Sequence, residues 1–141
     1  MTKYTAKALH PDASELNHEA YKRGCTLFHD ENYHKAKLAF EEALSYWPKD
    51  SQAWMALGNC EDELNKPKAS ESCFRRALKY CEDKNRNAIR FNLANSLLDQ
   101  ERHGEAIELY EQIPGDNDVY AQAQRNLSIA KLSLQDNGKK T

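Results

Sequence analysis

The sequence predicts an all-α protein, an α-solenoid in which antiparallel helix hairpins stack one after another. Two observations lead to this fold class. First, residues recur at a constant interval, because Gly24 and Phe40 are followed 34 residues later by Gly58 and Phe74. Second, the apolar residues within each copy lie three or four positions apart, as on one face of a helix. Because a single short hairpin cannot bury its own apolar face, neighbouring copies must stack to form the core.

Composition excludes several other classes of protein. The 141 residues are 40% hydrophobic and 30% charged, with 5 Gly and 4 Pro, which argues against a disordered chain or a loop-rich β-sandwich. A formal charge of −2 argues against nucleic acid as a partner. No apolar run approaches the roughly 20 residues that span a membrane, and residues 1–16 contain no apolar stretch typical of a signal peptide. The predicted location is therefore the cytoplasm, with no membrane partner.

Caps and turn-forming residues mark the helices in chain order. Asp12 predicts the start of the first helix, and the run Asp30-Glu31-Asn32 predicts the turn inside the first hairpin. Pro48-Lys49-Asp50-Ser51 separates the first copy from the second, and Pro67 can open a helix because its missing N–H is not needed there. Pro114-Gly115 ends the sixth helix. The predicted helices span residues 12–30, 33–46, 51–64, 67–81, 86–100, 103–113 and 118–134.

The third copy follows at a longer interval than the second. Leu57 and Phe74 recur 36 residues later as Leu93 and Tyr110, and two extra residues around Asn85-Arg86 account for the difference. The last predicted helix matches only half a copy, as expected for the end of an array. The predicted organisation is a partly helical or disordered leader at 1–16, repeats at 17–50, 51–86 and 87–117, a capping helix at 118–134 and a disordered tail at 135–141.

Equivalent positions of these copies carry a family resemblance. The stretch Trp54-x-x-Leu57-Gly58, followed by Phe74 and Ala77, resembles the signature of the tetratricopeptide repeat. The other two copies match it, the third more loosely, at Gly24, Ala36, Phe40, Ala43, Pro48, Leu93, Ala94, Ala106 and Tyr110. The resemblance covers about residues 17–120 and implies three repeats, a right-handed superhelix and a capping helix. It also implies a non-catalytic protein that binds other proteins.

In a superhelix of this kind the first helix of each hairpin lines a concave groove. Mapping the repeat positions onto this sequence gives the candidate partner-binding residues Tyr21, Lys22, Cys25, Phe28, Met55, Asn59, Phe91, Asn92, Asn95, Leu98, Arg125 and Asn126. The apolar members exceed what packing requires, so we interpret them as anchors for a partner peptide, with the asparagines pairing its backbone amides. The alternative is that the apolar side chains fill gaps between repeats. Trp47, beside the first inter-repeat turn, is a further candidate contact.

The best-known groove chemistry of the family is a clamp that holds a C-terminal carboxylate with Lys, Asn and Arg. The matching positions in this sequence are Tyr21, Cys25, Ala56, Ala88 and Asn92. None of them is a cation, so an adaptor for heat-shock chaperone tails is disfavoured. A shift of the third repeat by two residues would bring Arg86 and Arg90 into the pattern, still without a lysine in the first repeat.

No catalytic, cofactor or metal site is predicted. The sequence contains no Gly-rich phosphate loop, no G-x-S-x-G motif and no paired carboxylates. His18, Cys25 and His29 share one helix face, but no fourth metal ligand has a matching spacing. The four cysteines form no C-x-x-C pair and are predicted to be reduced thiols. The acidic run Glu61-Asp62-Glu63 is either a solvated face or a site for a basic ligand segment.

Three functions agree with these features. The first is an adaptor or assembly factor that binds a peptide or an extended segment of a partner protein. The second is a dedicated chaperone for a secreted protein, because the small chaperones of type III secretion systems have a similar size, acidity and helical leader. The third is self-association through Ile129 and Leu132, which lie away from the packing face formed by Leu127, Ala130 and Leu134 on the capping helix.

Overall fold

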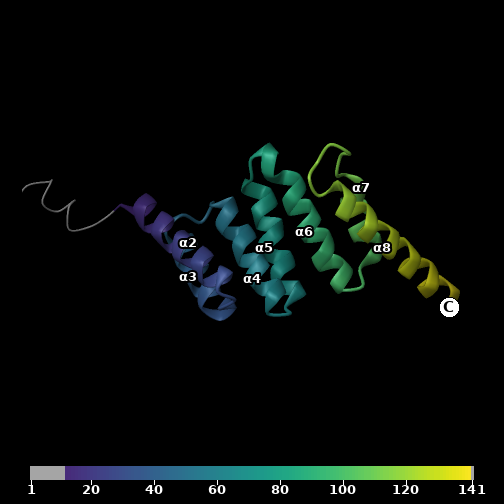
Figure 1. Cartoon of the computed structure of the whole chain (residues 1–141), viewed down its shortest axis with the longest axis horizontal. Coiled ribbons are helices and arrows are strands. Elements are labelled where there is room, and N and C mark those ends of the chain that lie inside the picture. Colours follow the sequence, from purple (N-terminus) through teal and green to yellow (C-terminus); the bar gives the residue numbers. More distant parts are fainter. Residues whose placement is uncertain (1–11, 141) are drawn as a thin grey trace, which may run out of the picture.

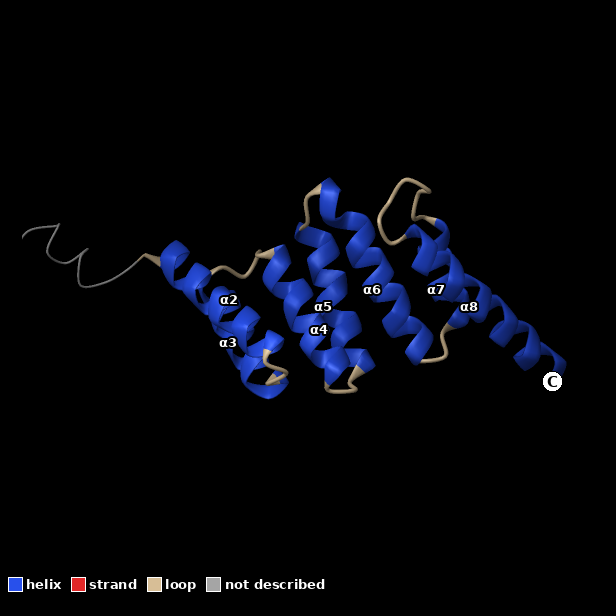
Figure 2. Cartoon of the chain, in the orientation of Figure 1, coloured by secondary structure: helices blue, strands red, loops and turns tan. Residues whose placement is uncertain are grey.

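The computed structural model describes residues 12–140, and the regular structure in this range is entirely helical. The helices lie in chain order along the long axis, from the purple N-terminal hairpin to the yellow C-terminal helix (Figures 1 and 2). Up to α7, the predicted bounds agree with the observed ones within two residues. The helices are α2 (Ala13–His29), α3 (Tyr33–Tyr46), α4 (Ser51–Glu63), α5 (Pro67–Tyr80), η1 (Asp83–Asn85), α6 (Arg86–Asp99), α7 (His103–Glu111) and α8 (Tyr120–Lys140).

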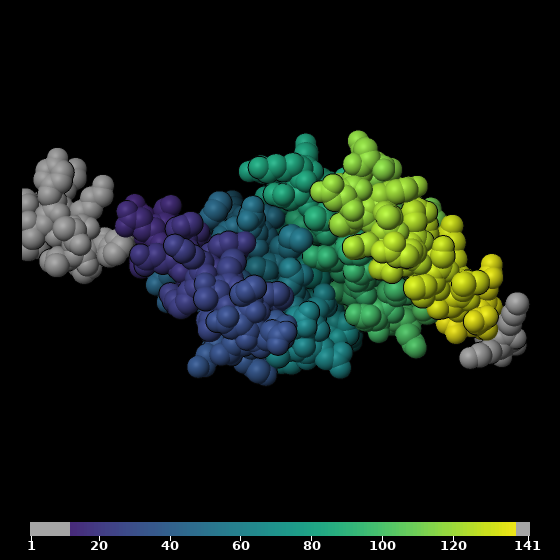
Figure 3. Space-filling model, viewed as in Figure 1, coloured from purple at the N-terminus to yellow at the C-terminus, as the bar shows by residue number. Residues whose placement is uncertain are grey.

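Each hairpin contacts only its neighbours, which confirms the predicted solenoid. Successive helices pack against each other, and within residues 12–140 no contact reaches beyond the next helix but one. The surface in Figure 3 keeps the same order of colours for this reason. The backbones of the first helices also approach one another, in the pairs α2–α4, α4–α6 and α6–α8. In the described part of the chain the backbones of α3, α5 and α7 do not approach one another in this way, although Arg75 of α5 reaches Glu105 of α7 at 4.0 Å. The stack is therefore curved, with the first helices on its inner side.

Glycine and phenylalanine meet in the same way in the first two hairpins. Gly24 in α2 faces Phe40 in α3, and Gly58 in α4 faces Phe74 in α5. Both rings are at most 1% exposed. A Cβ atom on either glycine would lie 2.5 Å from the ring, so only glycine lets the two helices approach closely enough to bury it. In the third hairpin the fully buried Tyr110 takes the place of the phenylalanine.

The last helix differs from the prediction. α8 continues to Lys140, so the expectation of a disordered tail from residue 135 is wrong for residues 135–140. No proline interrupts this segment, and a glycine such as Gly138 costs a helix only about 1 kcal/mol. Leu134, expected on the packing face, is 48% exposed. The reason is length, because α7 has 9 residues and α8 has 21, so the last turns of α8 extend beyond α7.

The start of the chain is described only from Asp12. Residues 1–11, which form most of the predicted leader, lie outside the described residues. Asp12 is the N-cap of α2, as predicted, and its side chain accepts a hydrogen bond from the backbone N–H of Glu15 at 2.9 Å. None of the described helices combines the length and apolar character needed to cross a membrane.

A carboxylate between the second and third hairpins is held by three donors. Glu71 in α5 accepts hydrogen bonds from Gln100 Nε2 at 3.1 Å and from Arg102 Nη1 at 2.7 Å. Arg75 Nε, one turn further along α5, lies 2.9 Å from the same carboxylate. Burial opposes ionisation of Glu71, but the three hydrogen bonds outweigh it and lower the pKa of this carboxyl below its ordinary value.

Replacing Glu71 with Gln is expected to make the stability of the fold depend less on pH in the acid range. Because the pKa of Glu71 is lower in the folded state, its contribution is complete above the unfolded-state pKa and is lost as the pH falls through the folded-state pKa. The variant should therefore melt below wild type at neutral pH but lose less stability between about pH 5 and about pH 2. Thermal melts followed by circular dichroism measure this, with exposed Glu108→Gln as the control. Parallel profiles for wild type and Glu71→Gln would contradict the assignment.

Candidate functional site

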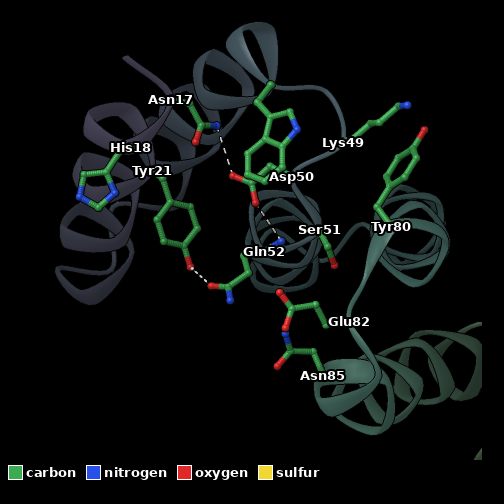
Figure 4. A pocket seen from close by; sticks show the side chains of 11 residues that line it. Asn17, His18, Tyr21, Lys49, Asp50, Ser51, Gln52, Tyr80, Glu82 and Asn85 are labelled. Atoms are coloured by element: carbon green, nitrogen blue, oxygen red, sulfur yellow. Dashed lines mark hydrogen bonds between the residues drawn. The ribbon is translucent and has the colours of Figure 1, made fainter. Parts of the chain in front are cut away.

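Three adjoining hollows open on the inner side of the stack, between α2, α4 and the start of α6. The largest, which we call the polar hollow, measures about 500 Å³ and is drawn in Figure 4. The middle hollow measures about 240 Å³ and the apolar hollow about 210 Å³. Tyr21 lines all three, so we refer to them together as the Tyr21 groove.

The hollows differ in the chemistry of their walls. The apolar hollow is lined by Tyr21, Cys25, Phe28, Phe40, Ala56 and Asn59. The middle hollow shares three of these residues and adds Ser51, Gln52, Met55, Asn85, Ala88 and Ile89. The polar hollow lies beside the loops before α4 and α6, and its further members are Asn17, His18, Trp47, Lys49, Asp50, Tyr80 and Glu82. The groove therefore changes from apolar to polar along its length.

Tyr21 is positioned by contacts with two neighbouring helices. Its ring packs against Phe40 of α3, with 5.6 Å between ring centroids, and its hydroxyl donates to Gln52 Oε1 of α4 at 3.4 Å. Burial, together with the nearby Cys25 and Asp50, raises the pKa of Tyr21 to about 12. The hydroxyl therefore remains protonated at neutral pH, and its single O–H is the one that Gln52 accepts.

One wall of the polar hollow contains Asp50, which is not among the site residues predicted from the repeat positions. Asp50 is the N-cap of α4, and its Oδ1 accepts from the backbone N–H groups of Gln52 at 3.1 Å and Ala53 at 3.3 Å. Its Oδ2 accepts from Asn17 Nδ2 at 3.2 Å, and the same nitrogen lies 2.9 Å from the carbonyl of Ala43. The available signal was an Asp directly before a predicted helix start.

The structure brings together five of the twelve candidate residues. Those that line the Tyr21 groove are Tyr21, Cys25, Phe28, Met55 and Asn59. Phe91 and Leu98 are partly buried and pack against the core, and the Phe91 ring lies 6.2 Å from that of Tyr110. Lys22 and Arg125 are exposed. Apart from Lys22, which lies on α2 outside the three hollows, the candidate residues divide between the groove and the helices α6 and α8.

Asparagines on the inner side pair with one another across repeat boundaries. Asn92 donates to Asn59 Oδ1 at 3.3 Å, and Asn126 donates to Asn95 Oδ1 at 2.9 Å. The hydroxyl of Tyr110 also donates to Asn95. These bonds use part of the hydrogen-bonding capacity that we expected a ligand to use, although each amide has four hydrogen-bonding positions.

The same pairing defines the register of the third repeat. Asn59 and Asn92 are 33 residues apart, whereas Asn95 and Asn126 are 31 apart. The first pair spans the junction between the second and third repeats, and its spacing is longer by the two extra residues. These residues therefore lie in the connection between α5 and α6, which contains η1. The two-residue shift that would bring Arg86 and Arg90 into the clamp pattern is not adopted. Arg86 instead pairs with Asp83 at 3.0 Å, and Arg90 donates to Asn87 at 3.0 Å.

The acidic run at the end of α4 is not one continuous solvated face. Glu61 is only 4% exposed and pairs with Lys37 Nζ at 2.8 Å. Asp62 is partly buried and accepts from Ser96 Oγ at 3.1 Å, and burial raises its pKa despite this hydrogen bond. Within residues 12–140 no group of three or more His, Cys, Asp and Glu side chains is arranged to hold a metal ion.

Two cysteines lie in the core rather than on the inner side. Cys60 and Cys73 are buried, and burial raises the pKa of each thiol to about 12. Such thiols are protonated at neutral pH and poorly reactive. Cys25 is exposed and lines the apolar hollow.

Comparison with protein families gives a match over most of the chain. The model described as "Tetratricopeptide repeat" matches residues 21–86 and 61–119. No curated protein matches this sequence.

Solved structures share the fold at low sequence identity. The first TPR domain of Spaghetti (RPAP3), bound to an HSP90 peptide, has a TM-score of 0.78 and 15% identity, with 86% of this chain and 95% of that chain covered. The TPR2B domain of yeast Sti1, in a complex with pHsp70, has a TM-score of 0.77 and 14% identity, with 84% of this chain and 98% of that chain covered. The type III secretion translocator chaperone SycD of Yersinia enterocolitica has a TM-score of 0.75 and 17% identity, with 93% of both chains covered.

Proposed function

The chain belongs to the tetratricopeptide repeat family, and on this premise we propose that it is a non-catalytic adaptor or assembly factor that holds an extended segment of a partner protein in the Tyr21 groove. The observation that carries the proposal is the continuity of the groove. Three hollows on the inner side of the stack share Tyr21 and include five of the residues expected from the repeat positions. An extended peptide can place successive side chains in successive hollows.

The ligands of two structural relatives support a peptide as the ligand of this chain. The Spaghetti domain is described as bound to an HSP90 peptide, and SycD has also been solved with a peptide of the translocator YopD. We propose an internal segment of the partner rather than its C-terminus, because no cation stands at the clamp positions. Arg86 and Arg90, the nearest alternatives in sequence, are bound to Asp83 and Asn87.

A dedicated chaperone for a secreted protein is the second candidate function. It is favoured by the similarity to SycD, which extends over 93% of both chains. Self-association through α8 is a third reading, because Ile129 and Leu132 are 52% and 61% exposed. We propose the cytoplasm as the location in each case.

Replacing Ala56 with Arg is expected to weaken partner capture by at least about tenfold. Ala56 lines both the middle and the apolar hollows and is half-buried. The longer side chain would fill both hollows while its guanidinium reaches solvent, and no packing contact would be removed. An affinity pull-down from lysate with mass spectrometry, performed on wild type and variant, measures the effect.

Ala121→Arg is the matched control, because Ala121 is exposed on α8 and the change in charge is the same. Equal melting temperatures for all three proteins would show that the fold is intact. Loss of one dominant partner only in Ala56→Arg supports the groove, and a partner that is insoluble alone favours the chaperone function. Equal recovery by Ala56→Arg and wild type would rule out the Tyr21 groove as the binding site.

A further inference from the structure

The polar hollow combines aromatic walls with carboxylates. Tyr21, Trp47 and Tyr80 line it, and Trp47 is 53% exposed, which is unusual for a large apolar side chain on a small domain. Asp50 and Glu82 lie on the same hollow, from the loops before α4 and α6 (Figure 4). Aromatic faces and carboxylates both attract cations.

Among residues 12–140, no strong ion pair neutralises the two carboxylates. Glu82 lies 3.5 Å from Lys84, but both side chains are 75% exposed, and such pairs contribute little. Asp50 receives hydrogen bonds from neutral donors, the amide of Asn17 and two backbone N–H groups, and forms no ion pair with any described residue. It lies close enough to Tyr21 to contribute to the raised pKa of that hydroxyl.

The cations near the hollow leave its centre free. Lys49 lines the hollow, but its side chain extends away from Asp50 and Glu82 in Figure 4. Lys79 lies over the ring of Tyr80, with Nζ at 5.5 Å from the centroid. Lys79 therefore takes up one face of the Tyr80 ring, and it forms no ion pair with either carboxylate in the described part of the chain.

We propose that the polar hollow binds an arginine or lysine side chain of the partner segment, next to an apolar side chain held in the apolar hollow. This inference rests on the proposed function and adds the chemistry of the ligand. The cation would pair with the carboxylate of Glu82, while Asn85 supplies a neutral amide acceptor beside it and Trp47 and Tyr80 offer ring faces. The polar hollow would thus bind a positively charged group, whereas the family's clamp binds a negatively charged carboxylate.

A displayed library of random dodecapeptides, selected on the whole chain, tests the inference. We expect enriched peptides to contain Arg or Lys at a constant distance from an apolar residue. Their affinity should fall about tenfold when the basic residue is replaced by citrulline, which keeps the shape of arginine without its charge. It should fall by a similar factor in the protein variant Glu82→Gln.

Glu111→Gln is the matched control, because Glu111 is also exposed and in a long ion pair, 3.8 Å from Lys131. Neither variant is expected to change the melting temperature, and only Glu82→Gln should weaken binding. Enriched peptides without a basic residue, or with equal affinity for Glu82→Gln and wild type, would overturn the inference and leave the proposed function standing. If no enriched peptide binds Ala56→Arg more weakly than wild type, both the inference and the proposed function would be overturned.

Discussion

Replacing Gly58 with Ala is expected to lower the free energy of unfolding by about 2 kcal/mol. The added Cβ would lie 2.5 Å from Phe74 Cε1 and 2.7 Å from Cδ1, well inside van der Waals contact. The Phe74 ring is 0% exposed and cannot move into solvent, so α4 and α5 would have to separate. The gain in helix propensity from Gly to Ala, about 1 kcal/mol, does not offset this strain. Urea unfolding followed by circular dichroism measures the loss.

Gly104→Ala provides the opposite case in the same protein. Gly104 lies in the first turn of α7, and an added Cβ meets no atom within 4 Å. This variant should be more stable than wild type, by up to about 1 kcal/mol. A smaller side chain opposite position 58 should also relieve the first variant, so Phe74→Leu combined with Gly58→Ala is expected to cost less than the sum of the single changes. A Gly58→Ala variant as stable as wild type would show that the hairpin tolerates a wider spacing.

Replacing Asp50 with Ala is expected to destabilise the fold by about 2 kcal/mol, through two losses at one site. The N-terminus of α4 loses the acceptor of its Gln52 and Ala53 N–H groups. The buried amide of Asn17 loses its 3.2 Å partner and keeps only the carbonyl of Ala43. Asp50→Asn should recover part of the loss, because Asn is also a good N-cap.

Asp12→Ala is the control for the capping part of this effect. Asp12 caps α2 in an exposed position and accepts one hydrogen bond, from Glu15 N at 2.9 Å. Its removal should cost about 1 kcal/mol or less. If Asp50→Ala were no more destabilising than Asp12→Ala, the bond between Asp50 and Asn17 would contribute nothing to the junction between the first two hairpins.

The repeat pattern predicted the hairpins well because the same contacts recur in each copy. Gly24 with Phe40 and Gly58 with Phe74 have the same geometry, so the interval of 34 residues reports directly on packing. Local signals at Asp12 and Pro67 marked helix starts correctly. The end of α8 was missed, because a capping helix has no following repeat to mark where it stops.

The candidate site was predicted only in part. Tyr21, Met55 and Asn59 occupy positions that face the inner side in any stack of this type, and they line the groove. Asn92 and Asn126 also face inward, but their amides donate to asparagines of the first helix in the preceding repeat. Whether an amide remains available to a ligand depends on an asparagine 31 or 33 residues away in the sequence. The repeat period does not show which side chains form these pairs.

The sequence by itself determined the fold class, the hairpins and the side of the stack that carries the first helices. These follow from the spacing of apolar and small residues, since burial of the same positions in every copy is what stabilises the array. Only the tertiary structure decided where the inner side is hollow. The polar hollow forms where α2, α4 and the end of α5 meet the loops before α4 and α6, and it joins Trp47 to Glu82 across a repeat boundary. Its shape and charge depend on side chains from different repeats, whose distances no periodic pattern records.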